Sequence, residues 1–209
     1  MKVKVNTIEQ TNIVHVKNVI APETIQKYVD KILDYKEKNL TTEGTNPSCW
    51  RGNPHLGPNG FNDEENDLLR KVIADARSLF DDTQTRPVQF ANVPHMIDRF
   101  DTENVILHAW FNVNDKGGAN ISHTHTGFYM SGVLYFQGTG TGNIEFYTQN
   151  YLYNTLHACS PYYGTSRYAP EDGDLLLFPS HLAHHVEPNP SDRQRINMAF
   201  NVEYALRGN

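Results

Sequence analysis

The second half of this sequence alternates short apolar runs with turn residues, and this pattern constrains the fold more than any other feature. The runs are rich in β-branched, aromatic and leucine side chains, and they are bounded by Gly, Pro and Asn, which end strands and form turns. They comprise residues 105–111, 130–136, 144–147, 175–178 and 196–202. Residues 138–142, with three glycines, are predicted to be a flexible hairpin connection into the run at 144–147. Several short strands with such turns predict a sandwich or a closed barrel.

Two amphipathic helices are predicted in the first half. Pro22 stands at the first turn of one, in which apolar residues three and four apart continue to about residue 37. Asn62 and Glu65 form a capping box at the start of the other, and its apolar face continues to Phe80. Both helices are expected to bury one face against the rest of the protein.

The order of the elements, helices followed by many strands, predicts an α+β protein with its helices packed outside the sheet. A length of 209 residues favours a single domain, with residues 1–83 as a helical scaffold and residues 84–209 as the strand-rich core. Residues 13–16 are predicted to form a strand. Residues 38–61, rich in Asn, Gly and Pro without periodicity, are predicted to form a long loop.

Charge and composition exclude several classes of protein. Eighteen basic and 24 acidic residues give a formal net charge of −6. This charge argues against a protein that binds duplex nucleic acid or an anionic membrane. The sequence lacks an apolar run of a signal peptide and any stretch of the ~20 apolar residues that a bilayer crossing needs. Cys49 and Cys159 match no metal or redox spacing, and two isolated thiols fit a reducing compartment. A cytoplasmic location is therefore predicted.

Histidines cluster at two places in the strand-rich half. His123 and His125 precede a predicted strand and, two residues apart in extended chain, can face one interior point. His184 follows another predicted strand and can supply a third ligand. Three neutral imidazoles suit Fe, Zn, Cu or Ni and leave open positions for other ligands. The alternative is that the His-x-His pair is solvated surface, because short motifs match by chance.

Two arginines follow these histidines in the chain. Arg193 and Arg195 stand nine and eleven residues after His184. A guanidinium turned inward beside a metal is costly unless it meets an anion. A dicarboxylate is a natural anion for this place, because the planar fork of arginine binds a carboxylate through two hydrogen bonds. Arg193 is favoured as a solvated turn residue over an anion-binding one, and spacing alone leaves both arginines as candidates for the anion.

These segments together resemble the 2-oxoglutarate and iron(II)-dependent oxygenases, in a branch related to the prolyl hydroxylases. The resemblance covers about residues 105–203. It rests on the order of four motifs: His123-Thr-His125, Ser131-Gly132-Val133-Leu134-Tyr135, Phe178-Pro179-Ser180 with His184, and Arg195-Ile196 followed by Asn201. Each motif alone is weak, whereas their combination in this order is specific. The resemblance implies a double-stranded β-helix, a jelly-roll or cupin-like fold, with the N-terminal helices on the outside.

The resemblance also implies a role for residues around the co-substrate. Arg195 takes the place of the arginine that binds the far carboxylate of 2-oxoglutarate, and Tyr135 matches a tyrosine that helps to hold the same group. Asn197 stands where many relatives have Ser or Thr. Asn112 is a weaker candidate for the metal-side end of the co-substrate.

The implied metal ligands are His123 and His184, and the departure from the family is His125. Most members have Asp or Glu at that position, so the usual two-histidine, one-carboxylate triad is in question. We expect His125 itself to be a ligand, which gives a three-histidine site. The alternative third ligand is Glu145, the nearby acid on a predicted strand.

The implied reaction is hydroxylation that uses Fe(II), 2-oxoglutarate and O2 and releases succinate and CO2, with a peptide or a small molecule as substrate. A tyrosine-rich stretch over residues 147–168 is expected to cover the substrate. Peptidyl hydroxylation is favoured by analogy alone. Two alternatives stay open: a cupin-like three-histidine dioxygenase or zinc hydrolase without a keto acid, and a non-catalytic jelly-roll binding protein.

Overall fold

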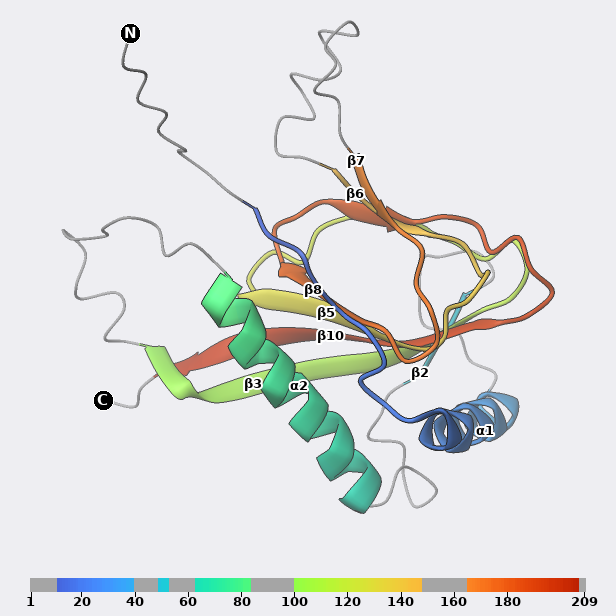
Figure 1. Cartoon of the computed structure of the whole chain (residues 1–209), viewed down its shortest axis with the longest axis horizontal. Coiled ribbons are helices and arrows are strands. Elements are labelled where there is room, and N and C mark those ends of the chain that lie inside the picture. Colours follow the sequence, from blue (N-terminus) through green and yellow to red (C-terminus); the bar gives the residue numbers. More distant parts are fainter. Residues whose placement is uncertain (1–10, 40–48, 53–62, 84–99, 148–164, 207–209) are drawn as a thin grey trace, which may run out of the picture.

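The protein is described here from a computed structural model of the whole chain (Figure 1). The structure describes residues 11–39, 49–52, 63–83, 100–147 and 165–206.

Two helices lie on the outer face of the larger of two sheets (Figure 1). Helix α1 spans Pro22–Lys38 and helix α2 spans Asp63–Thr83. Both bounds agree with the predicted helices. The predicted strand at the N-terminus is also present, as β1 (Val14–Val16).

Within the described residues, ten strands form two sheets, and every pair of neighbouring strands is antiparallel. The larger sheet has the order β1-β8-β5-β10-β3-β2, and the smaller has the order β4-β9-β6-β7. The remaining strands are β2 (Cys49–Gly52), β3 (Phe100–Asn114), β4 (Asn120–His123), β5 (Met130–Gln137), β6 (Ile144–Tyr147), β7 (Thr165–Tyr168), β8 (Leu175–Pro179), β9 (His184–Val186) and β10 (Arg195–Leu206). Two facing antiparallel sheets with helices outside make the predicted double-stranded β-helix.

Strand β10 separates a helix-facing core from a sheet-facing interior. It pairs with β3 on one side and with β5 on the other. Because side chains alternate along a strand, one set from β10 packs against the helices and the other faces the smaller sheet. The helix-facing set is Ile196, Met198, Phe200 and Val202. The opposite set is Arg195, Asn197, Ala199 and Asn201, so polar groups are brought inside the β-helix.

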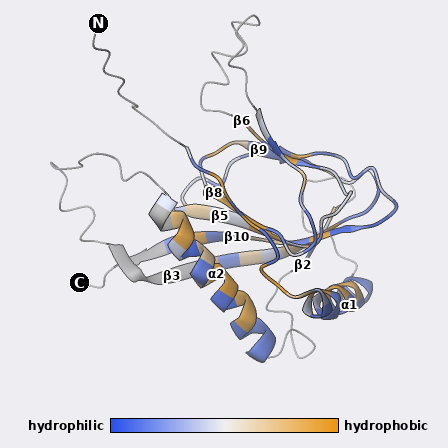
Figure 2. Ribbon diagram, viewed as in Figure 1, coloured by the Kyte–Doolittle hydropathy of each residue, from blue (hydrophilic) through white to orange (hydrophobic). Residues whose placement is uncertain are grey.

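The helices bury apolar faces against the larger sheet (Figure 2). Tyr28 of α1 lies 5.2 Å from Phe136 of β5 between ring centroids, and its hydroxyl donates to the Glu65 carbonyl at the start of α2. Phe80 near the end of α2 is 1% exposed and meets the Tyr129 ring edge-on. These contacts join both helices to the sheet and to each other.

Three predicted connections differ from the structure. Residues 138–142 do not form a β-hairpin, because β5 pairs with β8 and β10 while β6 pairs with β7 and β9 of the other sheet. The segment therefore crosses between sheets. Strand β2 lies within the predicted loop at 38–61, and β7 lies within the predicted tyrosine-rich loop, most of which falls outside the described residues.

Neither helix in the described part of the chain has the length and apolar character that a membrane crossing requires. Cys49 is buried and has a free thiol, and Cys159 lies outside the described residues.

Phe80→Ala is expected to lower the free energy of unfolding by about 3–5 kcal/mol, because it leaves a cavity between α2 and the sheet. The neighbouring Leu79 is 48% exposed, so Leu79→Ala is the matched control and should cost less than about 1 kcal/mol. Urea denaturation followed by circular dichroism measures both. Equal losses in the two variants would contradict the docking of α2 through Phe80.

Candidate metal centre and cavity

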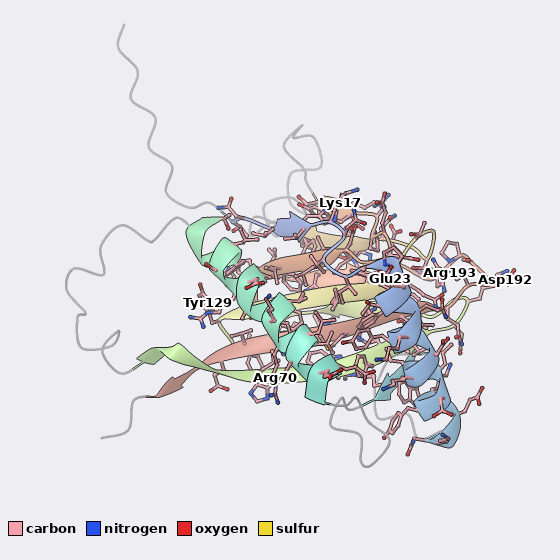
Figure 3. All side chains as sticks on the ribbon, turned by 60° about the horizontal axis from the view of Figure 1, so that its bottom comes forward. Lys17, Glu23, Arg70, Tyr129, Asp192 and Arg193 are labelled. Carbon is pink, nitrogen blue, oxygen red and sulfur yellow. The ribbon has the colours of Figure 1, made fainter. Side chains whose placement is uncertain are left out.

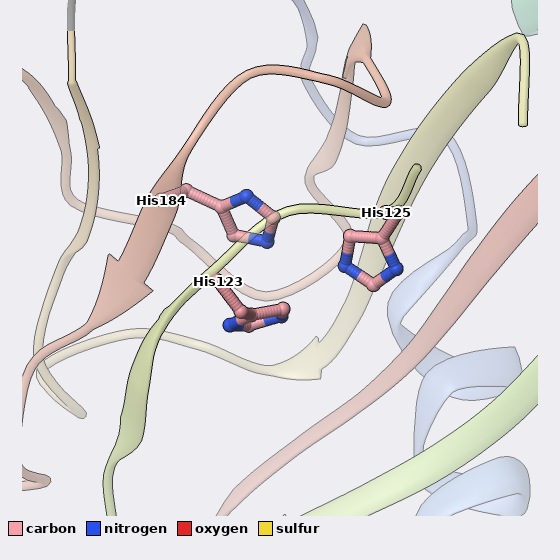
Figure 4. A group of neighbouring side chains, drawn as sticks. All are labelled: His123, His125 and His184. Atoms are coloured by element: carbon pink, nitrogen blue, oxygen red, sulfur yellow. The ribbon is translucent and has the colours of Figure 1, made fainter. Parts of the chain in front are cut away.

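Three histidines converge on one point (Figure 4). Two lie on strands of the smaller sheet, and the third lies in the loop after β4. His123 is the last residue of β4 and pairs directly with His184, the first residue of β9. His125 lies beyond the end of β4, and its backbone N–H donates to the Ser180 carbonyl. One ring nitrogen of each histidine lies within 4.8 Å of those of the other two. Among the described residues this is the one cluster of metal-binding side chains.

Backbone contacts fix which nitrogen of two histidines is free. His123 donates its Nδ1–H to the Ile121 carbonyl at 2.7 Å, and His184 donates its Nδ1–H to the Leu182 carbonyl at 2.9 Å. Since Nδ1 carries the proton in both rings, Nε2 has its lone pair available. A hydrogen bond on the far nitrogen is the usual arrangement of a metal-bound histidine.

Burial favours the neutral form of the His125 and His184 imidazoles. Burial is the main reason that the pKa of His184 falls to about 3. The hydrogen bond to Leu182 raises this pKa, and the neighbouring histidines lower it. Burial, with the charges of His123 and Arg51, lowers the pKa of His125 to about 4. A neutral imidazole is the form that binds a metal ion, so these residues need no deprotonation near pH 7.

The histidines line a cavity of about 450 Å³ between the two sheets. Six of the seven residues predicted for the site line its wall: His123, His125, His184, Tyr135, Asn197 and Asn112. Asn112 of β3 donates to the Asn197 side-chain oxygen of β10 at 2.9 Å. Tyr135 is 1% exposed, and burial raises the pKa of its hydroxyl well above the ordinary value, so it stays protonated. Tyr135, Asn112 and Asn197 therefore offer neutral hydrogen-bonding groups at the wall.

Arg195, the seventh predicted residue, is fully buried beside the cavity and does not line it. It lies two residues from Asn197 along β10, and its charge acts on the Tyr135 hydroxyl. Three of its five N–H groups donate to the carbonyls of Thr141, Glu187 and Gly118, at 2.6, 3.1 and 3.1 Å. Its buried Nε has no partner in the structure. Part of the guanidinium is thus left to bind another acceptor.

The other candidates lie away from the centre. Arg193 pairs with Asp172 through two hydrogen bonds at the protein surface, as expected of a turn residue (Figure 3). Glu145, the alternative third ligand, is not part of the histidine cluster. Its carboxylate lies 3.4 Å from His185 and 3.7 Å from Arg167, because the alternation of β6 turns Ile144 toward the cavity instead.

Thirteen further residues of the cavity wall were not predicted from the sequence as site residues. Five of them are Arg51, Trp110, Asn120, Ser131 and Asn201. Asn201 shares the inward face of β10 with Asn197, so strand alternation from that residue was a usable signal. Arg51 gave no signal, because its strand is short and surrounded by turn-forming residues.

The fold is a double-stranded β-helix, and three histidines that could hold a metal ion meet between its sheets. Comparison with family models gives a match over residues 108–201 to a family described as "Putative 2OG-Fe(II) oxygenase". Comparison with curated proteins by sequence gives no match.

The solved structures with the same fold include the following three, whose sequences have low identity to this chain. A prolyl-4-hydroxylase of Pseudomonas putida is 12% identical, with 95% of this chain and 94% of that chain covered and a TM-score of 0.59. A prolyl hydroxylase of Trichoplax adhaerens, in complex with a peptide fragment, is 12% identical over 92% and 82%, with a TM-score of 0.62. HygX of Streptomyces hygroscopicus, with nickel and 2-oxoglutarate bound, is 12% identical over 92% and 83%, with a TM-score of 0.58.

The resemblance stated from the sequence is confirmed: residues 108–201 match the 2OG-Fe(II) oxygenase family, and the fold of the chain agrees with that match. Its cofactors are those of that family, namely Fe(II), 2-oxoglutarate and O2. The roles of individual residues remain predictions.

His123→Ala and His184→Ala should each lose stable Fe(II) binding while the thermal unfolding transition is kept, because a three-ligand site tolerates few losses. His125→Ala should also lose the metal, and His125→Asp should retain it, since a carboxylate replaces the imidazole as a ligand. Metal analysis after gel filtration measures the stoichiometry. His108→Ala is the control, because His108 is 47% exposed and pairs with Glu203. A full equivalent of Fe(II) in any of the three alanine variants would remove that residue from the ligand set.

Arg195→Ala should raise the Kd for 2-oxoglutarate by about thirtyfold or more and leave Fe(II) binding near the wild-type level, because a charge-assisted contact is lost. Arg195→Lys is the second variant, because it keeps the charge of a buried group that also holds three carbonyls, and it should be intermediate. Arg193→Ala should change the Kd little. Calorimetric titration of the metal-loaded protein gives the values, and a larger effect at Arg193 would transfer the role to that residue.

Proposed function

We propose that this chain is a hydroxylase that holds Fe(II) through His123, His125 and His184 and binds 2-oxoglutarate beside them. The observation that carries the proposal is that three imidazoles meet at one cavity between the two sheets, beside a buried arginine whose Nε has no partner. The reaction class is oxidation of a C–H bond of a peptide or a small molecule.

The donor set fits a divalent transition metal. Imidazole nitrogen is a ligand for iron, zinc, copper and nickel alike, and three protein ligands leave coordination positions for a co-substrate. Two of the three ligands have their tautomer fixed by a backbone carbonyl. When bound, the iron and the keto acid supply the oxidising chemistry with O2, and succinate and CO2 are released.

The chain also fits the anion. Arg195 keeps the buried Nε–H for an incoming acceptor, and the neutral Tyr135 hydroxyl stands in its field. Gly142 makes room for this guanidinium, because a Cβ at that position would lie 3.1 Å from Arg195 Nη1 and its φ of +95° disfavours other residues. Asn112 and Asn197, joined by their own hydrogen bond, present the remaining amide groups to the cavity.

The remaining contribution of the chain is positioning and exclusion of water. Phe178 and Phe146 pack against the His184 ring, with centroids 4.8 and 5.7 Å away, and Trp110 stacks on His125. These rings hold the imidazoles in place and exclude water from their sides. No general base is required of the protein in this class of reaction.

The narrower proposal is peptidyl hydroxylation of the prolyl type. It rests on likeness in fold to two prolyl hydroxylases, one of them bound to a peptide fragment, and a fold alone does not define a substrate. A cytoplasmic location is part of the same proposal and rests on the two isolated cysteines.

Anaerobic addition of Fe(II) and then 2-oxoglutarate to the purified protein should give a visible metal-to-ligand absorption band. Admission of O2 should then yield succinate equal in amount to the 2-oxoglutarate consumed, even without a substrate. Arg195→Ala should reduce the band at limiting 2-oxoglutarate, and Arg193→Ala should not. A metal-loaded protein that gives neither band nor succinate would favour a three-histidine dioxygenase or hydrolase without a keto acid, and a protein without metal affinity would favour a binding protein.

A further inference from the structure

Arg51 is a positive charge at the cavity wall that has no place in the metal site or around the co-substrate. It is the third residue of β2, is half-buried, and lines the same cavity as His125. Its guanidinium carbon lies 4.9 Å from the centroid of the Trp110 ring. That ring stacks on the His125 imidazole, with centroids 5.8 Å apart and planes 25° apart. The Trp110 ring therefore lies between Arg51 and His125, one of the three clustered histidines.

Arg51 has no acidic partner in the part of the chain that the structure describes. Three other arginines, Arg70, Arg167 and Arg193, each form an ion pair. The contact with Trp110 holds the guanidinium in position through a cation–π interaction and leaves its N–H groups free to donate to a ligand. A half-buried guanidinium of this kind is stabilised when an anion arrives.

The charges around the cavity leave room for a second anion. Its described wall contains no aspartate or glutamate, and an imidazole ligand brings no negative charge to a metal ion. A divalent ion there keeps its whole charge, because no ligand is a carboxylate. The two negative charges of 2-oxoglutarate offset the two of the ion. Arg51 then contributes a positive charge at the described wall that no negative charge offsets.

We propose that Arg51 binds a carboxylate of the substrate, so that the substrate is a small organic acid or a peptide with a free C-terminal carboxylate. This inference rests on the proposed function and specifies its substrate class. The planar guanidinium can bind a carboxylate through two parallel hydrogen bonds. Trp110 and Ile121, whose side chain is 61% exposed at the wall, offer apolar surface to the rest of the molecule. The carbon to be oxidised then lies toward the histidines.

The test uses the full chain loaded with Ni(II) and 2-oxoglutarate, which does not turn over, and follows tryptophan fluorescence during titration. The sequence has two tryptophans, and Trp50 is 4% exposed in the core, so a ligand on Arg51 reports through Trp110. The probes are matched pairs of acid and carboxamide: N-acetylleucine, N-acetylphenylalanine and N-acetylproline for small acids, and a proline-containing pentapeptide for a C-terminus. The acid of at least one pair should bind about tenfold or more tightly than its amide.

Arg51→Gln should abolish this preference, and Arg51→Lys should keep part of it because the charge remains while the fork is lost. Arg70→Gln is the control, because Arg70 lies on α2 on the outside of the protein (Figure 3), and it should match the wild type. Preference confined to the small acids, or to the pentapeptide, identifies which source of carboxylate the site takes.

Two results would overturn the inference: equal binding of acids and amides to the wild type throughout the panel, or an acid preference that persists in Arg51→Gln. A loss of 2-oxoglutarate affinity in Arg51→Gln greater than in Arg195→Lys would also overturn it, by assigning Arg51 to the co-substrate. Failure of the wild type to take up Ni(II) and 2-oxoglutarate would instead refute the proposed function.

Discussion

The pairing of β10 with β3 and β5 is the constraint on which the rest of the structure depends. It places one strand in the middle of the larger sheet, with each of its faces buried for a different reason. The apolar face anchors the helices, and the polar face lines or adjoins the cavity. A slip of one residue in this register would turn Phe200 into the cavity and the neighbouring amides into the core. The register therefore determines the hydrophobic core and the polar site together.

Local sequence patterns predicted the helices and most strands of this fold, but they did not predict which strands pair with each other. The spacing of apolar residues was enough for α1 and α2, because a helix satisfies its own backbone. The partners of β5 are set by strands far along the chain, so the glycine-rich segment after it suggested a hairpin that does not exist. Strand β2 is four residues long, and its pairing with β3 is what makes it a strand. Propensity over so short a stretch cannot reveal it.

The candidate site shows the same division. Spacing and resemblance brought together His123 and His184, which the antiparallel pairing of β4 with β9 makes direct neighbours. His125 was predicted because residues two apart in a strand share a face. In the structure β4 ends at His123, and a backbone hydrogen bond to Ser180 positions His125 instead. Arg51 enters the cavity from β2, a part of the chain far from every motif. Tertiary structure alone brings such a residue into the site.

His123 of β4 and His184 of β9 lie on neighbouring strands of one sheet, and each donates its Nδ1–H to the carbonyl two residues earlier. Both bonds form within the polypeptide, so folding orients the rings and selects their tautomers before any ion arrives. Loading then requires little ordering of side chains, and the free energy of ion binding adds to an already folded protein by mass action. Small zinc domains are the opposite case, since their chains stay unfolded until the metal binds. We therefore expect this protein to stay folded when iron is withdrawn from it.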